Sequence, residues 1–225
     1  MRHTFLIVAI LLLVAVPVLG APSFLGGFSG NILTPDGLIL PTGGWQASFH
    51  QFNDFLIFNR DLTAVGLGYG LAQDLEVGAS FFNNDGSDVA FHGKYRLVPD
   101  TAQRPVVIVG ALDAFGTADD LDGDPGFYLL LSKNLGPTPI DVGPNPFRLT
   151  VGFGSGFLDG FFAAAEWIPT DQLSLMVEFT NANVTGGGNI VDIGARYAIA
   201  PNFRVDLGLV DVSDLVFGAS YTSGF

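Results

Sequence analysis

Cysteine is absent from this chain of 225 residues. Its absence excludes a disulfide framework, thiolate metal sites and thiol-based catalysis. Basic residues are also few: 9 Lys and Arg stand against 22 Asp and Glu, and the formal net charge is −13. Nucleic acid and anionic lipid head groups would repel a chain this acidic, so nucleic acid is excluded as a partner.

Long apolar runs are absent after the N-terminus, although 48% of the residues are hydrophobic. A membrane-spanning helix needs about 20 apolar residues, so helical spans cannot account for this apolarity. Residues 1–20 have the pattern of a cleaved signal peptide: Arg2 lies at the start, an apolar core runs from Phe5 to Val16, and small residues precede Ala21. An uncleaved anchor is disfavoured, because this core is short for a span.

The chain instead alternates apolar residues with small or polar ones at a period of two. Near the C-terminus, for example, Leu215 and Phe217 alternate with Gly218 and Ser220. Such alternation is typical of a strand with one apolar and one polar face. It predicts twelve strands, over residues 45–51, 61–70, 75–81, 89–97, 105–114, 126–134, 147–154, 161–167, 173–179, 191–197, 203–209 and 215–225.

These strands predict the fold class. Within hydrocarbon no backbone group can stay unpaired, so a membrane protein made of strands has to close on itself. An even strand number suits a closed single-chain barrel. We therefore expect an all-β protein with a single closed antiparallel transmembrane β-barrel of about twelve strands at residues 45–225. Its seam should pair Leu215–Phe225 antiparallel with Trp45–Gln51.

The facing of two strands is harder to assign. In residues 105–114 a run of valines hides the alternation. Placing Asp113 inward puts Val106, Ile108 and Leu112 outward. In residues 126–134 the facing stays open, because residues 127–131 are continuously apolar.

The C-terminal strand ends on an aromatic residue, and so resembles the closing strand of bacterial outer-membrane β-barrels. In those proteins such an ending is an assembly signal, which Tyr221 and Phe225 would carry here. The resemblance implies the outer membrane of a Gram-negative-type bacterium. It also implies outer-membrane lipid and the barrel assembly machinery as partners.

Residues 21–44 are rich in Gly and Pro and precede the first strand. Pro35-Asp36-Gly37 predicts a turn, and the apolar pieces on either side could form a small hairpin. The segment is similar to the start of the YjbH-like outer-membrane proteins linked to exopolysaccharide production, which implies polysaccharide or small solutes as partners. The residues that match are Asn31, Ile32, Leu33, Thr34, Pro35, Leu40, Pro41 and Gly43. We expect residues 21–44 to be periplasmic or to plug the lumen.

Charged residues fall on the faces predicted to point inward, where Gly, Ala and Ser leave room for water. They are open to two interpretations: a salt-bridge ladder that fixes strand register, or a pore lining that selects solutes by charge. Opposite charges on neighbouring strands predict Glu76 beside Lys94 and Arg96, Glu178 beside Arg196, and Asp192 beside Arg204. The full inward set is Glu76, His92, Lys94, Arg96, Asp113, Arg148, Glu166, Glu178, Asp192, Arg196, Arg204 and Asp206.

An acidic loop invites a comparison with calcium sites. Asp120, Asp122 and Asp124 have alternate spacing, but Gly123 is at position four and Leu131 replaces the bidentate Glu at position twelve. The EF-hand interpretation therefore fails. A solvated loop is the default, and weak divalent binding by the three aspartates is the alternative. We expect no cofactor.

Catalytic signals are sparse. His50 and His92 are predicted to point inward, but no nucleophile motif surrounds Ser48 or Ser80. The sequence therefore predicts a non-enzymatic outer-membrane barrel, a channel or a structural component of envelope or exopolysaccharide handling. The alternatives are a general diffusion porin, a barrel-embedded hydrolase and a secreted soluble β-sandwich.

Overall fold

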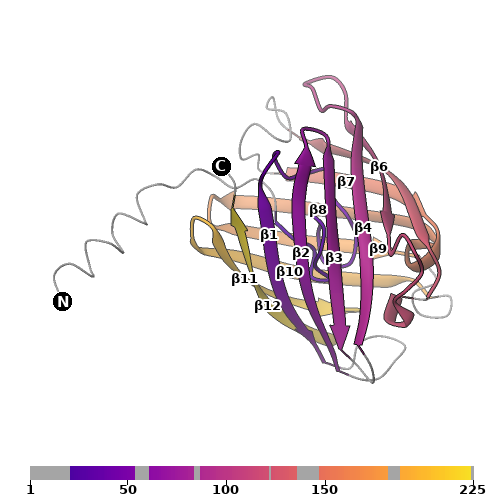
Figure 1. Cartoon of the computed structure of the whole chain (residues 1–225). Helices are drawn as coiled ribbons and strands as arrows, with labels where there is room; N and C mark the ends of the chain where they lie inside the picture. The colour runs from indigo at the N-terminus through magenta and orange to yellow at the C-terminus, as the bar shows by residue number, and fades with distance from the viewer. Residues whose placement is uncertain are drawn as a thin grey trace.

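Twelve antiparallel strands close into a barrel, as the alternation predicts (Figure 1). The computed structural model describes residues 21–53, 61–83, 87–121, 123–135, 147–181 and 188–223. Every strand pairs with its neighbours in the sequence, and β1 also pairs with β12. The strands are β1 (Trp45–Phe52), β2 (Leu62–Ala72), β3 (Leu75–Asn83), β4 (Ser87–Val98), β5 (Val106–Leu112), β6 (Gly126–Asn134), β7 (Phe147–Gly154), β8 (Gly160–Thr170), β9 (Leu173–Thr180), β10 (Ile190–Ala200), β11 (Phe203–Val210) and β12 (Asp214–Ser223).

The predicted seam is confirmed. β1 and β12 pair antiparallel in one register, from Trp45 opposite Ser223 to Phe52 opposite Val216. At the edge of this seam the rings of Trp45 and Tyr221 lie 5.1 Å apart. Phe225 and the predicted signal peptide lie outside the described residues, so their roles stay predictions.

The outer surface of the barrel is apolar. Large side chains point outward at every second position, such as Phe49 on β1, Leu67 on β2 and Phe91 on β4. Such a surface suits the hydrocarbon of a membrane, where an exposed Lys or Arg would cost about 2–4 kcal/mol at the midplane. No helix in the described part of the chain is long and apolar enough to span a bilayer.

The predicted facing of β5 is wrong. Val106, Ile108 and Leu112 are buried inside the barrel rather than exposed on its outer surface. Asp113, which set the prediction, comes after the last residue of β5 and has a φ of +50°. Its side chain is buried, but a residue in that left-handed conformation no longer follows the alternation of the strand. In β6 the structure places Tyr128, which is buried, on the inner face.

The two ends of the barrel differ in their interiors. We name the end that carries Trp45 and the connections β2–β3, β8–β9 and β10–β11 the turn end, and the opposite end the loop end. At the loop end most buried residues of the strand termini are apolar, although Thr180 at the end of β9 is polar. The 3-10 helices η2 (Asp119–Leu121) and η3 (Gly156–Leu158) lie in the loops there, and they also contribute buried apolar side chains. This apolar layer comprises Phe52, Leu62, Phe82, Leu112, Leu121, Phe157, Leu158, Phe162, Ile190, Val210 and Val216.

Candidate functional site: the barrel lumen

The N-terminal residues 21–44, which we call the plug, occupy the lumen. The chain reaches them from the turn end, where Gly43 N donates to Gly70 O and Gly70 N donates to Gly44 O, both at 2.8 Å. Residues 21–38 are all buried. In Figure 1 the plug is the indigo coil seen between the strands. Its apolar side chains form one cluster with the apolar layer of the loop end, so the room expected for water is filled.

The predicted hairpin around Pro35–Gly37 does not form. The plug contains only two isolated bridges, which pair Pro22 with Ser29 and Gly30 with Pro35. A buried segment that is not paired in a sheet needs other hydrogen-bond partners for its backbone N–H and C=O groups. In the plug many of those groups bond to charged side chains of the barrel wall.

Two buried glutamates accept hydrogen bonds from the amides of the plug. Glu178 on β9 accepts from the N–H groups of Ile32 (3.3 Å), Leu33 (3.0 Å) and Thr34 (3.2 Å), and from the Thr34 hydroxyl (2.7 Å). Glu76 on β3 accepts from the amides of Ser29 (2.5 Å) and Leu40 (2.9 Å), and from the Ser29 hydroxyl (2.8 Å). Each carboxylate therefore replaces the partners that a strand would have supplied.

Two buried cations bind the carbonyl oxygens of the plug. On β4, the Nζ of Lys94 donates to the carbonyl oxygen of Ser29 (2.7 Å) and to the carboxylate of Asp36 (3.1 Å). On β10, Arg196 donates to the carbonyl oxygens of Pro22 (2.7 Å), Gly30 (3.4 Å) and Asn31 (3.5 Å). We refer to Glu76, Lys94, Glu178 and Arg196 as the anchor residues.

Glycines let the plug backbone touch the barrel wall. Gly26 and Gly27 have φ values of +75° and +71° and turn the chain against β2 and β3. A Cβ on Gly66 would lie 2.2 Å from the backbone nitrogen of Gly27, and one on Gly78 would lie 1.6 Å from its carbonyl oxygen. Only glycine fits at these two wall positions. The glycine-rich faces were a signal of close backbone approach.

Other charged residues of the predicted set pair within the wall. Arg148 on β7 donates to Glu166 on β8 at 2.6 Å, and Arg196 also donates to Asp206 on β11 at 2.8 Å. Arg96 bonds Asp74 at the turn end, at 2.7 Å. Asp192 accepts from the amide of Asp211 (2.9 Å), and Asp113 accepts from the amide of Ala118 (2.9 Å). Arg204 lies on β11 opposite Ala198 and Ser220.

Two of the predicted charge neighbours are wrong. Glu76 does lie opposite Lys94. Glu178, however, lies opposite Asp192, and Arg196 lies opposite Ser174. Arg204 lies opposite Ala198, far along β10 from Asp192. The reason is register: the β9–β10 pairing, with Thr180 opposite Ile190, brings Glu178 to Asp192, and the β10–β11 pairing, with a shift between Ala198 and Ala200, brings Asp206 to Arg196.

The geometry does not place His92 as the base for Ser80. His92 Nε2 lies 2.8 Å from Ser80 Oγ, and the amide of Asp113 donates to His92 Nδ1 at 3.3 Å. With Nδ1 accepting, a neutral ring carries its proton on Nε2 and donates it to Ser80, so it cannot remove the serine proton. His50 Nε2 lies 2.9 Å from Asp206. Both histidines are buried under the plug, against Phe24 and Phe28.

The acidic loop gives no metal site that can be described. Asp122 lies outside the described residues, as does the side chain of Asp120. Among the side chains that are described, no group of three or more His, Asp or Glu is placed to hold a metal ion. Divalent binding by Asp120, Asp122 and Asp124 stays a prediction.

The seam strands carry a strip of buried polar groups that the sequence did not single out. Six buried atoms on the inner faces of β1 and β12 have no hydrogen-bond partner within the described ranges. The register places the residues side by side, with Gln46 opposite Thr222 and Ser48 opposite Ser220. The six atoms are Gln46 Oε1 and Nε2, Ser48 Oγ, His50 Nδ1, Ser220 Oγ and Thr222 Oγ1.

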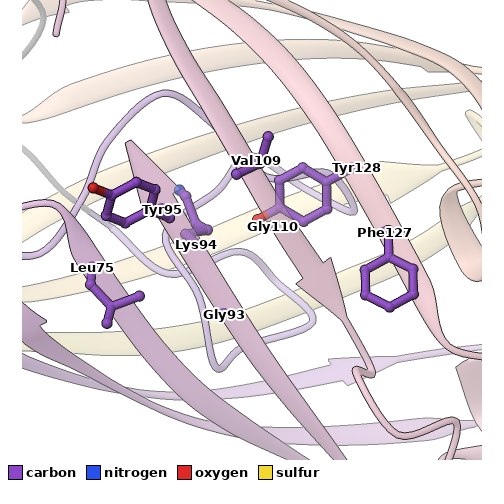
Figure 2. A pocket seen from close by; sticks show the side chains of 8 residues that line it. All are labelled: Leu75, Gly93, Lys94, Tyr95, Val109, Gly110, Phe127 and Tyr128. Atoms are coloured by element: carbon purple, nitrogen blue, oxygen red, sulfur yellow. The ribbon is translucent and has the colours of Figure 1, made fainter. Parts of the chain in front are cut away.

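One hollow of about 420 Å³ lies across β3 to β6 (Figure 2). Gly93 forms part of its lining, and nothing lies within 4 Å of the position that a Cβ there would take. Tyr95 and Phe127, which are exposed, flank it on the outer surface of the barrel. The hollow therefore opens to the surroundings of the barrel, and the buried side chains of Lys94 and Tyr128 also belong to its lining.

Comparison with known proteins supports the fold. No protein-family model and no curated protein matches this chain. Among solved structures, the KdgM porin matches with a TM-score of 0.54 and 8% identity, over 81% of this chain and 99% of that one. A structure of the KdgM porin in complex with disordered oligogalacturonate gives 0.53 and 9%, over 81% and 99%. The NanC porin gives 0.52 and 10%, over 81% and 98%.

Identities this low show the fold alone. The YjbH-like resemblance gains no support from these comparisons and stays a prediction. The chain is thus a closed twelve-stranded β-barrel with the fold of porins, and its lumen holds its own N-terminal segment.

Proposed function

We propose that the protein is a non-enzymatic outer-membrane channel that is closed at rest by residues 21–44. The observation that carries this proposal is the set of hydrogen bonds from the anchor residues to the plug. Charges that would line an open pore bind the plug instead. The porin fold and the apolar outer surface support a place in the outer membrane, reached through the predicted signal peptide and the barrel assembly machinery.

The proposed solutes are small and polar, oligosaccharides included. One porin of similar fold has been solved in complex with oligogalacturonate, which supports this class of solute. Both signs of charge line the lumen of this chain, so we do not expect strong selection between anions and cations. A role in exopolysaccharide handling would fit the same solute class and rests on the YjbH-like resemblance.

Single-channel recording in planar bilayers tests the proposal. The intact protein should give few or no conductance steps. The double variant Glu76→Gln, Glu178→Gln keeps the shape of both side chains but loses their charge, and hydrogen bonds to a charged group are worth about 1.5–3 kcal/mol each. We expect this variant to open in discrete steps. Stable steps from the intact protein would instead indicate a general diffusion porin.

One observation favours a second candidate, a structural barrel of the envelope that never conducts. The apolar layer of the loop end and the plug form one continuous core, and an apolar constriction excludes water even without a plug. This candidate predicts that the double variant stays silent although it is folded. Heat-modifiable migration on gels would establish that the silent variant is folded.

A further inference from the structure

The barrel wall recognises the plug through its main chain. Glu178 accepts hydrogen bonds from three consecutive amides, those of Ile32, Leu33 and Thr34. Lys94 and Arg196 donate hydrogen bonds to the carbonyl oxygens of four plug residues. These contacts involve groups that every peptide carries, so they depend little on the sequence of the plug.

Buried carboxylates and buried cations together match the chemistry of a polypeptide. A peptide offers N–H donors and C=O acceptors in alternation, and the lumen places acceptors and donors where each is needed. Neutral sugars offer hydroxyl groups, each of which can both donate and accept a hydrogen bond. Separate donor and acceptor positions would therefore not distinguish one sugar hydroxyl from another. We propose that the lumen is a peptide-binding site, which takes up a peptide supplied by another molecule when the plug leaves.

The side chains of the plug add a coarser requirement. Phe24 stacks on His50 with ring centres 4.8 Å apart, and Phe28 meets His92 edge-on at 5.1 Å. Between these two rings, Gly26 and Gly27 press against Gly66 and Gly78. A suitable peptide therefore carries two aromatic residues four positions apart, with two glycines directly before the second one. The proposal rests on the proposed function in one respect, which is that the plug can leave the barrel.

A cleavable plug tests the site in the full-length protein. Thr42 and Gly43 are exposed, and nothing lies within 4 Å of the position of a Cβ on Gly43. A protease recognition sequence inserted between them can be cut after the protein has folded. The plug is then held without a covalent bond. A fluorescent synthetic peptide with the sequence of residues 21–42 is added, and its uptake is followed by anisotropy and by mass spectrometry of the released fragment.

We expect saturable uptake of the labelled peptide after cleavage, and faster release of the original plug from the Glu178→Gln variant. Replacing the Leu33 amide of the peptide by an ester removes one N–H that bonds Glu178, and should weaken binding about tenfold or more. The same replacement at Thr42, which is exposed, is the matched control and should change nothing.

Three results would overturn the proposal. The first is a cleaved plug that neither leaves nor exchanges, in the parent protein and in Glu178→Gln alike. The second is uptake that the Leu33 ester does not weaken. The third is that two altered peptides are taken up as well as the peptide of residues 21–42. One has the same composition in scrambled order, and the other has both phenylalanines replaced. Conductance of the same samples is a separate readout: peptide exchange without any current counts against the channel alone, and current after cleavage without uptake counts against the peptide site alone.

Discussion

The strands that carry the anchor residues (β3, β4, β9 and β10) and the strands of the seam (β1 and β12) differ in their hydrogen bonds. On β3, β4, β9 and β10, four buried charges bond the main chain of the plug. On β1 and β12, six buried polar atoms have no partner among the described residues. Both sets of residues lie inside one barrel and face one segment of chain. The four anchor residues are thus bonded to the plug and the six seam atoms have no described partner, although Asp192 Oδ2 on β10 has none either.

This difference indicates which side of the plug is held. A buried polar group without a partner costs about 1–3 kcal/mol, whereas a hydrogen bond to a charged group contributes about 1.5–3 kcal/mol. The hydrogen bonds at the anchor strands therefore favour the plugged state, and the burial of unpartnered atoms at the seam opposes it. We expect the plug to loosen first at the seam, because water admitted there would hydrate the unpartnered atoms.

The largest effect is expected from Gly78→Val, which would prevent the Gly26–Gly27 turn from seating. The new Cβ would lie 1.6 Å from the carbonyl oxygen of Gly27, and a backbone atom cannot move aside as a flexible side chain can. The readout is alkylation by a maleimide of a Ser23→Cys reporter, because the chain has no other cysteine. Ser23 is fully buried, so the reporter should be protected in the parent and react at least a hundredfold faster with Gly78→Val.

Gly93→Val is the matched control for that experiment. Gly93 lies on β4 opposite Val77, the residue before Gly78, but nothing lies within 4 Å of the position of its Cβ. This variant should leave the reporter protected. If both valine variants leave Ser23→Cys equally protected, the plug does not depend on close contact with the wall.

A smaller effect is expected from Lys94→Met, which removes the cation between Ser29 and Asp36. Breaking a buried ion pair by removing one partner costs about 3–5 kcal/mol, because the other charge stays buried. Here Asp36 would keep the cation of Arg148, at 3.8 Å, and the amide of Leu38, at 3.0 Å. We expect exposure of the plug, measured as hydrogen exchange of the Ser29 and Leu40 amides, before the barrel itself unfolds.

Lys133→Met provides the comparison, since Lys133 bonds Asp100 at 2.7 Å away from the plug and is partly exposed. It should leave the exchange of the plug amides unchanged. Equal acceleration in both lysine variants would mean that loss of a cation acts on the whole barrel, and would remove the distinction between anchor strands and other strands.

The sequence was sufficient for the strands, the closure and the seam, because alternation at a period of two reports which face is buried. The sequence was insufficient for residues that do not follow this alternation. The prediction for the facing of β5 was wrong because it was based on Asp113, which follows the strand in a left-handed conformation. Counting from the β10–β11 turn would not have been enough either. Ala200 lies opposite Phe203, which by equal distance would place Leu207 opposite Arg196, but a register shift between Ala198 and Ala200 places Asp206 there.

The anchor contacts could not have been derived in that way. Ser29 bonds a residue 47 positions away, and Ile32 bonds one 146 positions away. The plug has no periodicity, so no pattern assigns its amides to particular carboxylates. The inward glycines at 66 and 78 were the available signal, and they indicated close approach without identifying the segment that approaches.

The smallest effect, and the sharpest comparison, comes from one substitution made on both sides of the lumen. Ser80 on β3 and Ser220 on β12 are both buried, but Ser80 Oγ lies 2.8 Å from His92 Nε2 whereas Ser220 Oγ has no partner among the described residues. Ser80→Ala leaves a buried donor unpaired and should lower the free energy of unfolding by about 1–3 kcal/mol. Ser220→Ala removes an unpaired hydroxyl and should leave stability unchanged or raise it by about 1 kcal/mol. Urea midpoints of the folded barrel in detergent micelles measure both. The opposite signs follow only if the seam is the unsatisfied side, so an equal loss in the two alanine variants would show that the seam hydroxyls have partners and that the plug is held evenly.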